Sequence, residues 1–120
     1  MERVKQAIGL EPQRKWTLAA LAGLAGASAY HLARVFREEV GATLHDYLTR
    51  ARLASALDRV LDADADLSAI AFDSGFASHS HFSARFRAMF GLAPSELRRA
   101  PRATIAKLRK ILTAPLTATA

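Results

Sequence analysis

The sequence predicts an all-α fold in which two helix-turn-helix units are joined by a long central helix. One observation is a pattern of apolar residues and glycine that occurs twice, about 50 residues apart. A second is the helical spacing of the apolar residues within both copies. A third is the segment between the copies, which has helical periodicity and contains no Gly or Pro.

The composition is that of one small, basic domain. The 120 residues include no Cys, which excludes disulfides, thiolate metal sites and thiol nucleophiles. No apolar run approaches the roughly 20 residues of a membrane helix, so no membrane partner is expected. The formal net charge is +6, yet residues 42–77 sum to −3 and residues 92–120 to +5. This distribution indicates distinct basic faces or a basic tail, which suit nucleic acid or another anionic surface.

Residues 18–36 fit two incompatible interpretations. Basic residues precede this Ala/Leu-rich run and Ala27-Ser28-Ala29 resembles a cleavage site, which is the outline of a secretory signal. However, the pattern L-x-x-[LI]-A-x-x-x-G begins at Leu18 and begins again at Leu67. A signal peptide would not be repeated inside the chain, so we favour the helix-turn-helix interpretation.

The first unit is predicted over about residues 17–41. Apolar residues at i, i+3 and i+4 indicate a short helix with one buried face, and Gly26 follows as a turn with positive φ. Ser28 is a good N-cap for the next helix, which ends at Gly41. The residues expected inside are Leu18, Leu21 and Ala22 on the short helix and Leu32, Val35, Phe36 and Val40 on the longer one.

The linker helix is predicted over about residues 44–61. The motif Thr43-x-x-Asp46 resembles a capping box at its start. A helix of this length is stiff and roughly 27 Å long. Its apolar stripe is predicted to be Tyr47, Leu48, Ala51, Ala54, Leu57 and Leu61.

The second unit is predicted over about residues 67–91. It repeats the first at an offset of 49 residues, which becomes 50 after the turn at Gly75 because this copy has one extra residue. Ser78 is the equivalent N-cap and Gly91 the equivalent helix end. The residues expected inside are Leu67, Ile70, Ala71, Phe82, Phe86, Met89 and Phe90.

Residues 66–99 resemble the second-half signature of the DNA-binding domain of the AraC/XylS transcriptional regulators, and residues 16–48 resemble its first half. The resemblance covers about residues 4–99 and implies an all-α fold of about seven helices, with two helix-turn-helix motifs joined by a long helix. The chain departs from the family at Ala84, where Arg is usual, and at Ala93, where a hydroxyl cap is usual. Most members also carry a preceding effector or dimerisation domain, so the chain is either a stand-alone regulator or an excerpt of a larger one.

A recognition helix presents its outer face and its N-terminal half to base edges in the major groove. The N–H groups that follow the two Ser caps suit phosphate. Removing the inner stripes leaves the candidate DNA-binding residues Ser28, Ala29, Tyr30, Ala33, Arg34 and Arg37 in the first unit and Ser78, His79, Ser80, Ser83, Ala84 and Arg87 in the second.

These candidates differ in their expected roles. Arg34 is the best base reader, because a guanidinium can pair bidentately with guanine. Arg37 and Arg87 are expected on phosphate, with pairing to Glu38 or Glu39 as the alternative for Arg37. Tyr30 either packs on a sugar or thymine methyl or caps the core. The second helix should discriminate less, because its His and Ser side chains are adaptable, and His31 and His81 are expected to be structural or phosphate-facing.

Other chemistry is poorly supported. Asp62-x-Asp64-x-Asp66 resembles the start of a calcium loop, but Leu67 stands where that loop needs Gly. His79 and His81 are two residues apart, on different sides of a helix, which disfavours a metal site. The Ser, His and Asp residues form no recognisable nucleophile motif. We therefore expect no enzyme, no metal and no cofactor.

The chain is divided into a DNA-binding domain, residues 1–99, and a basic tail, residues 100–120. Apolar and basic residues at helical spacing suggest a short amphipathic helix in the tail. It could pack on the domain, fray, or contact phosphate, an acidic partner or a membrane surface. Its apolar stripe is Ile105, Leu108, Ile111 and Leu112.

The sequence thus predicts a bacterial transcription factor in the cytoplasm, associated with the nucleoid. Its partners would be double-stranded DNA, RNA polymerase and the effector or dimerisation domain typical of the family. Two alternatives remain open. A non-specific or architectural DNA binder would lose little affinity on scrambled DNA, and a protein-interaction adaptor would show no salt-dependent DNA binding.

Overall fold

The structure is a computed structural model that describes residues 1–62 and 64–113. The predicted all-α fold is confirmed, with eight helices in these ranges instead of about seven. Residues 114–120 of the tail and the side chain of Leu112 lie outside the described part. The helices are α1 Glu2–Leu10, α2 Leu18–Ala25, α3 Ala29–Val40, α4 Leu44–Leu61, α5 Leu67–Asp73, α6 His79–Phe90, α7 Pro94–Leu97 and α8 Arg102–Thr113.

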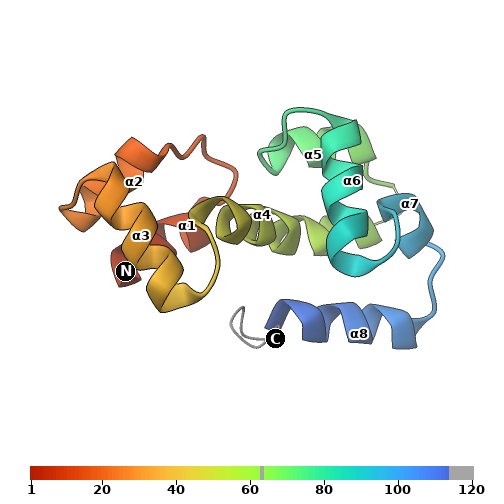
Figure 1. Ribbon diagram of the computed structural model, residues 1–120. Helices are drawn as coiled ribbons and strands as arrows, with labels where there is room; N and C mark the ends of the chain where they lie inside the picture. Colours follow the sequence, from red (N-terminus) through yellow and green to blue (C-terminus); the bar gives the residue numbers. More distant parts are fainter. Residues whose placement is uncertain (63, 114–120) are drawn as a thin grey trace.

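Helix α4 is the centre of an elongated molecule of 45 × 30 × 21 Å. Figure 1 shows α1, α2 and α3 gathered at one end of α4, and α5, α6 and α7 at the other. Helix α4 packs against α1, α3, α5, α6 and α7. The predicted two units on one long helix are therefore present, and the bounds of that helix are those predicted.

Each unit has its own hydrophobic core. In the first unit the buried residues are Val4, Ile8, Leu21, Ala22, Leu32, Phe36, Val40 and Leu48. In the second they are Leu53, Ala56, Leu57, Val60, Ile70, Ala71, Phe76, Phe82, Phe86, Phe90, Leu97 and Leu108. The predicted inner stripes of α3 and α6 are confirmed, with Val35 and Met89 half-buried at their edges.

The single apolar stripe predicted for α4 is wrong. Ala54 is exposed, whereas Leu53 and Val60, which lie outside that stripe, are buried. At about 100° per residue, the residues that face the first core lie roughly opposite those that face the second. The first set is Leu44, Tyr47, Leu48 and Ala51, and the second is Leu53, Ala56, Leu57 and Val60. The buried side of α4 therefore changes between Ala51 and Leu53, because each half of the helix serves a different core.

The predicted turns and caps of both units are confirmed. The Oγ of Ser28 accepts the N–H of His31 at 3.1 Å, and the Oγ of Ser78 accepts that of His81 at 3.0 Å. Gly26 has φ of 66°, in the left-handed region that favours glycine. Leu18 is a correction, because it is 40% exposed instead of buried. It is the first residue of α2, where it lies at the edge of the core beside an apolar groove.

The tail forms helix α8, which packs on the second unit. Leu108 is 4% exposed in the second core, and Ile105 and Ile111 are half-buried against it. Arg109 donates to Asp58 on α4 at 2.7 Å, and Arg50 on α4 donates to the carbonyl of Ile111. In Figure 1, α8 accordingly runs alongside α4.

Phe86 is fully buried, and its ring packs against Phe90 at 4.6 Å and Phe82 at 5.7 Å between centroids. We predict that Phe86→Ala lowers the free energy of unfolding by about 3–5 kcal/mol, because it removes a large apolar side chain and leaves a cavity. Chemical denaturation followed by circular dichroism measures this. Ser80→Ala, on the exposed face of the same helix, is the control and should change stability little. Equal stability of the two variants would show that α6 is rotated from this assignment.

Candidate nucleic-acid interface

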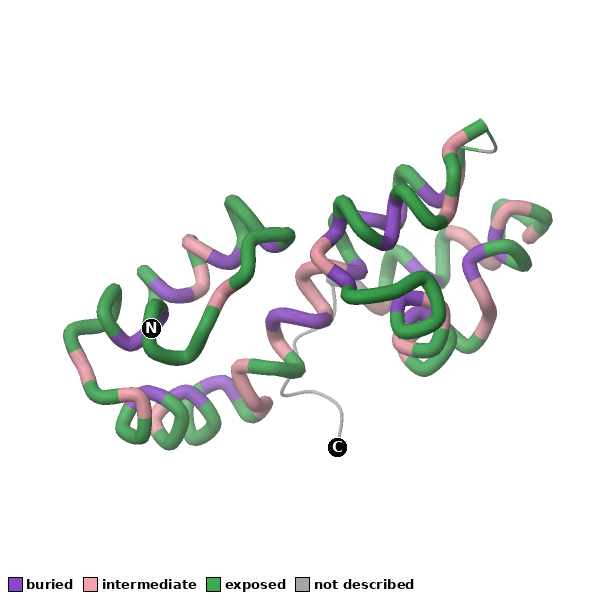
Figure 2. The backbone as a smooth tube through the Cα atoms, turned by 90° about the horizontal axis from the view of Figure 1, so that it is seen from above, coloured by how far each residue is buried: buried purple, intermediate pink, exposed green. Residues whose placement is uncertain are grey.

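The outer face of α3 presents the predicted residues of the first unit to solvent. Ala33, Arg34 and Arg37 are exposed, Ala29 is half-buried, and Tyr30 is 79% exposed. That exposure removes the alternative in which Tyr30 caps the core. Figure 2 shows buried and exposed residues alternating along the helices, so that a helix has a buried side and an exposed side. Tyr30, Ala33, Arg34 and Arg37 therefore share the exposed side of α3.

Arg34 has local partners on this surface. Its Nη1 lies 3.4 Å from Oε1 of Glu38, and its Nη2 lies 3.4 Å from Nδ1 of His31. The pairing that the sequence weighed for Arg37 is therefore made by Arg34. Exposed ion pairs contribute little to stability, so the Arg34 guanidinium can exchange Glu38 for a base or a phosphate at little cost.

The outer face of α6 is more polar and carries less charge. His79, Ser80, Ala84 and Arg87 are exposed, and Ser83 is half-buried. Arg87 lies 3.6 Å from Glu96, whose Oε1 also accepts the N–H of Ala93 at 2.9 Å. Glu96 thus supplies part of the cap that the Ala93 side chain lacks. The two outer faces occupy equivalent positions in their units but offer different groups to a ligand.

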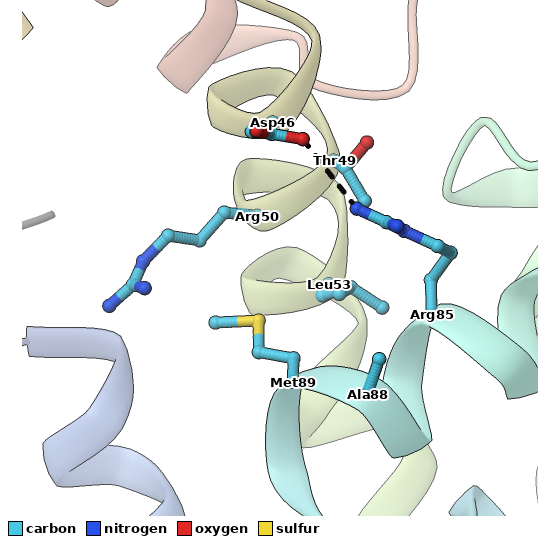
Figure 3. Close-up of a pocket in the computed structure, with 7 residues that line it drawn as sticks. All are labelled: Asp46, Thr49, Arg50, Leu53, Arg85, Ala88 and Met89. Atoms are coloured by element: carbon cyan, nitrogen blue, oxygen red, sulfur yellow. Dashed lines mark ion pairs between the residues drawn. The ribbon is translucent and has the colours of Figure 1, made fainter. Parts of the chain in front are cut away.

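Arg85 does not replace the Arg that is usual at position 84. Figure 3 shows its side chain reaching from α6 toward α4, where it pairs with Asp46 at 3.8 Å. The pair borders a groove of about 220 Å³ between α4 and α6, above Leu53 and beside Met89. The Arg85 side chain therefore points toward the junction between these helices and not to the outer face of α6.

The three His residues near the candidate surface differ in their surroundings. His79 and His81 are exposed, but the ring of His81 also packs edge-on against Phe76 at 5.5 Å. His31 contacts Arg34 on the outer face of α3. A structural role fits His81 best, whereas His31 and His79 lie where they could contact a ligand.

Two acidic residues at the ends of α5 have structural partners. The carboxylate of Asp66 caps α5 by accepting the N–H of Ser68 at 3.1 Å, and Asp73 pairs with Arg59 at 3.3 Å. Residues 1–62 and 64–113 contain no group of three His, Asp or Glu side chains placed to hold a metal ion. In the same ranges, every helix is too short or too polar to cross a membrane.

Sequence reasoning missed an apolar groove of about 310 Å³ in the first unit, beside α2, α3 and α4. Trp16 lies at one side, where its Nε1 donates to the carbonyl of Glu11 at 2.9 Å and Arg14 lies 4.6 Å above its ring. Tyr47 lies deeper in this unit, edge-on to Phe36 at 5.4 Å. Burial, and secondarily the charge of Glu2, raises the pKa of Tyr47. A lone Trp at a helix edge was the only sequence signal for the groove.

Comparisons with known proteins agree with this architecture. The profile of a helix-turn-helix domain family matches residues 21–100. A putative AraC-like transcription regulator from Streptomyces lividans is 36% identical over 91 residues, which are 76% of this chain and 30% of that protein. The regulator GlxA from Rhizobium meliloti is 35% identical over 99 residues, which are 82% of this chain and 29% of that protein. The chain thus spans about a third of the length of these relatives.

Solved structures share the fold. The DNA-binding domain of AdpA, a global transcriptional factor crystallised with a target DNA, superposes with a TM-score of 0.75 at 26% identity, covering 85% of this chain and 92% of that one. A DNA-binding transcriptional dual regulator from Escherichia coli K-12 gives 0.73 at 29% identity, covering 81% and 86%. The chain therefore belongs to the AraC family of transcription regulators and carries the helix-turn-helix DNA-binding domain of that family.

Proposed function

We propose that this chain binds a specific DNA sequence by inserting α3 and α6 into two successive major grooves. The observation that carries the proposal is the pair of Ser-capped helices of equal length, Ala29–Val40 and His79–Phe90, each buried on one face and exposed on the other. The similarity to the DNA-bound domain of AdpA supports it. In this proposal the DNA-binding residues are the outer-face residues of both helices together with Ser28 and Ser78.

The proposed roles follow from the side chains. Arg34 reads a base, and Arg37 and Arg87 hold phosphate. The proposal extends to gene regulation in the bacterial cytoplasm, at the nucleoid, through positioning or recruitment of RNA polymerase. The effector or dimerisation domain that is usual in the family would act on this domain, and no enzymatic step is assigned to it. An architectural DNA binder and a protein adaptor are the competing functions.

Selection of bound sequences from random duplexes tests the proposal. We predict an asymmetric preferred site, because the two outer faces differ and run in one chain direction. Affinity should fall on a scrambled duplex, and it should also fall steeply between about 50 and 200 mM salt, because phosphate contacts release counterions. Fluorescence anisotropy measures both. Equal affinity on scrambled DNA would favour the architectural binder, and absence of salt-dependent binding would favour the adaptor.

The role of Arg34 can be separated from that of Arg87. We predict that Arg34→Ala weakens binding to the preferred site by about 1–3 kcal/mol and relaxes the preference at one base position. Arg87→Ala should instead weaken binding to all sequences about equally. Affinities on single-base variants of the site measure the difference. A uniform loss for Arg34→Ala would assign Arg34 to phosphate.

The spacing of the two half-sites tests the two-groove arrangement. Successive major grooves on one face lie about 34 Å apart, so we predict half-sites about 10–10.5 base pairs apart and one chain per site. An insertion of about 5 base pairs turns one half-site to the far side of the duplex and should reduce specific binding to that of a single half. Gel shifts on a spacer series, with stoichiometry from sedimentation, measure this. Equal affinity on all spacers, or a strict need for two chains on a palindrome, would contradict it.

A further inference from the structure

Arg52 lies at the point on α4 where the buried side changes. Ala51 packs against the first core and Leu53 belongs to the second. The Arg52 side chain instead reaches the connection between α1 and α2. Its Nε donates to the carbonyl of Pro12 at 2.8 Å, and its Nη2 donates to that of Arg14 at 2.9 Å. The forked guanidinium thus ties a segment of the first unit to the middle of the linker helix.

The turn of the second unit closes against the same place. Gly75 precedes α6 with φ of 96°, and a Cβ on it would lie 2.8 Å from Nε of Arg52. The same Cβ would lie 3.0 Å from the carbonyl oxygen and 3.1 Å from the Cα of Gln13, in the α1–α2 connection. In Figure 1 this connection and the turn before α6 face each other above α4. Arg52 therefore lies at a junction where both units meet.

The equivalent turn in the first unit shows that such a turn can form without a close contact to the other unit. Gly26 is the equivalent turn residue in the first unit, and its φ of 66° is also in the left-handed region. A Cβ on Gly26 would meet nothing within 4 Å. Backbone conformation explains glycine at both positions, but close approach between units applies only to Gly75.

The ion pair between α6 and the start of α4 is a weaker connection than the Arg52 bonds. Arg85 of α6 pairs with Asp46 in the first turn of α4, but the atoms are 3.8 Å apart and the side chains are 41% and 58% exposed. Exposed pairs of this kind contribute little. Arg52 is half-buried, and its burial lowers the pKa of its guanidinium, which stays protonated. Loss of the Arg52 side chain would remove the hydrogen-bond donor of two backbone carbonyls, those of Pro12 and Arg14.

We propose that Arg52 is a positioning residue that holds the two helix-turn-helix units in one relative orientation, with Gly75 allowing the close approach. This relative orientation of the two units is set in the protein without DNA. Its consequence for DNA rests on the proposed function: Arg52 would fix the spacing and angle at which α3 and α6 meet the duplex, and so the spacing of half-sites that the chain accepts.

Distance measurements in the absence of DNA test the proposal. The chain has no Cys, so Glu39→Cys on α3 and Ala69→Cys on α5 provide two unique, exposed positions for spin labels outside the candidate interface. Double electron–electron resonance should give one narrow distance distribution for the parent protein. Arg52→Ala should broaden it while circular dichroism shows unchanged helix content. Arg59→Ala, which removes another Arg of α4 that pairs within the second unit, should leave the distribution narrow.

A second pair of variants covers the case in which Arg52→Ala fails to fold. Gly75→Ala should shift the mean distance, because its Cβ would press on the backbone of Gln13. Gly26→Ala carries the same kind of backbone strain without the contact, so it should keep the parent distance. An unchanged distribution in folded Arg52→Ala, or the same distance in both glycine variants, would overturn the proposal.

The consequence for DNA is measured separately. For the parent protein, the ratio of affinities between the preferred site and the site with about 5 inserted base pairs should be large. In Arg52→Ala that ratio should move toward one, because the units can turn independently. If the parent protein shows no such ratio, the two-groove proposal fails while the distance measurement still decides the role of Arg52. If the distances broaden and the ratio stays large, the unit orientation does not set the accepted spacing.

Discussion

The structure depends on one constraint: a single helix, α4, must bury apolar side chains on two nearly opposite sides. Its N-terminal half covers the first core through Leu48, and its C-terminal half covers the second through Leu53 and Val60. Packing against α4 holds each unit in place, since burial of apolar area is the main favourable term in packing. The molecule therefore consists of two small hydrophobic cores joined by α4. The outer faces of α3 and α6 remain exposed to a ligand.

The candidate interface consists of what the cores leave outside. Phe82, Phe86 and Phe90 turn one face of α6 inward, and their burial in the second core fixes the rotation of the helix. That rotation places Ser80 and Arg87 on the opposite face, in solvent. The ion pairs on these faces join neighbouring surface residues and are easily exchanged. Packing thus uses one side of α6 and leaves the opposite side to the proposed interface.

The two copies of the repeat have the same helix cap and the same kind of turn, but their surroundings differ. Both units cap the second helix with Ser and turn at Gly. Phe76, however, is buried at 4% exposure where the first copy has the half-buried Ala27. Gly75 meets the other unit, whereas its counterpart Gly26 faces open space. The duplicated units therefore have related folds but unequal roles in the assembly of the domain.

The sequence by itself determined the helix type, the caps, the turns and the inner faces of α3 and α6, because periodicity, Ser caps and positive-φ glycines act within a few residues of one another. It also identified the candidate DNA-binding residues, since these are the residues that remain on α3 and α6 once the apolar inner faces are assigned to the cores. Only the tertiary structure decided the change of face along α4, the pairing of Arg34 instead of Arg37 with Glu38, and the packing of α8 through Leu108. The bond from Arg52 to Pro12 joins residues 40 positions apart. Local patterns show which side of a helix is apolar, but contacts of this range depend on how the helices pack.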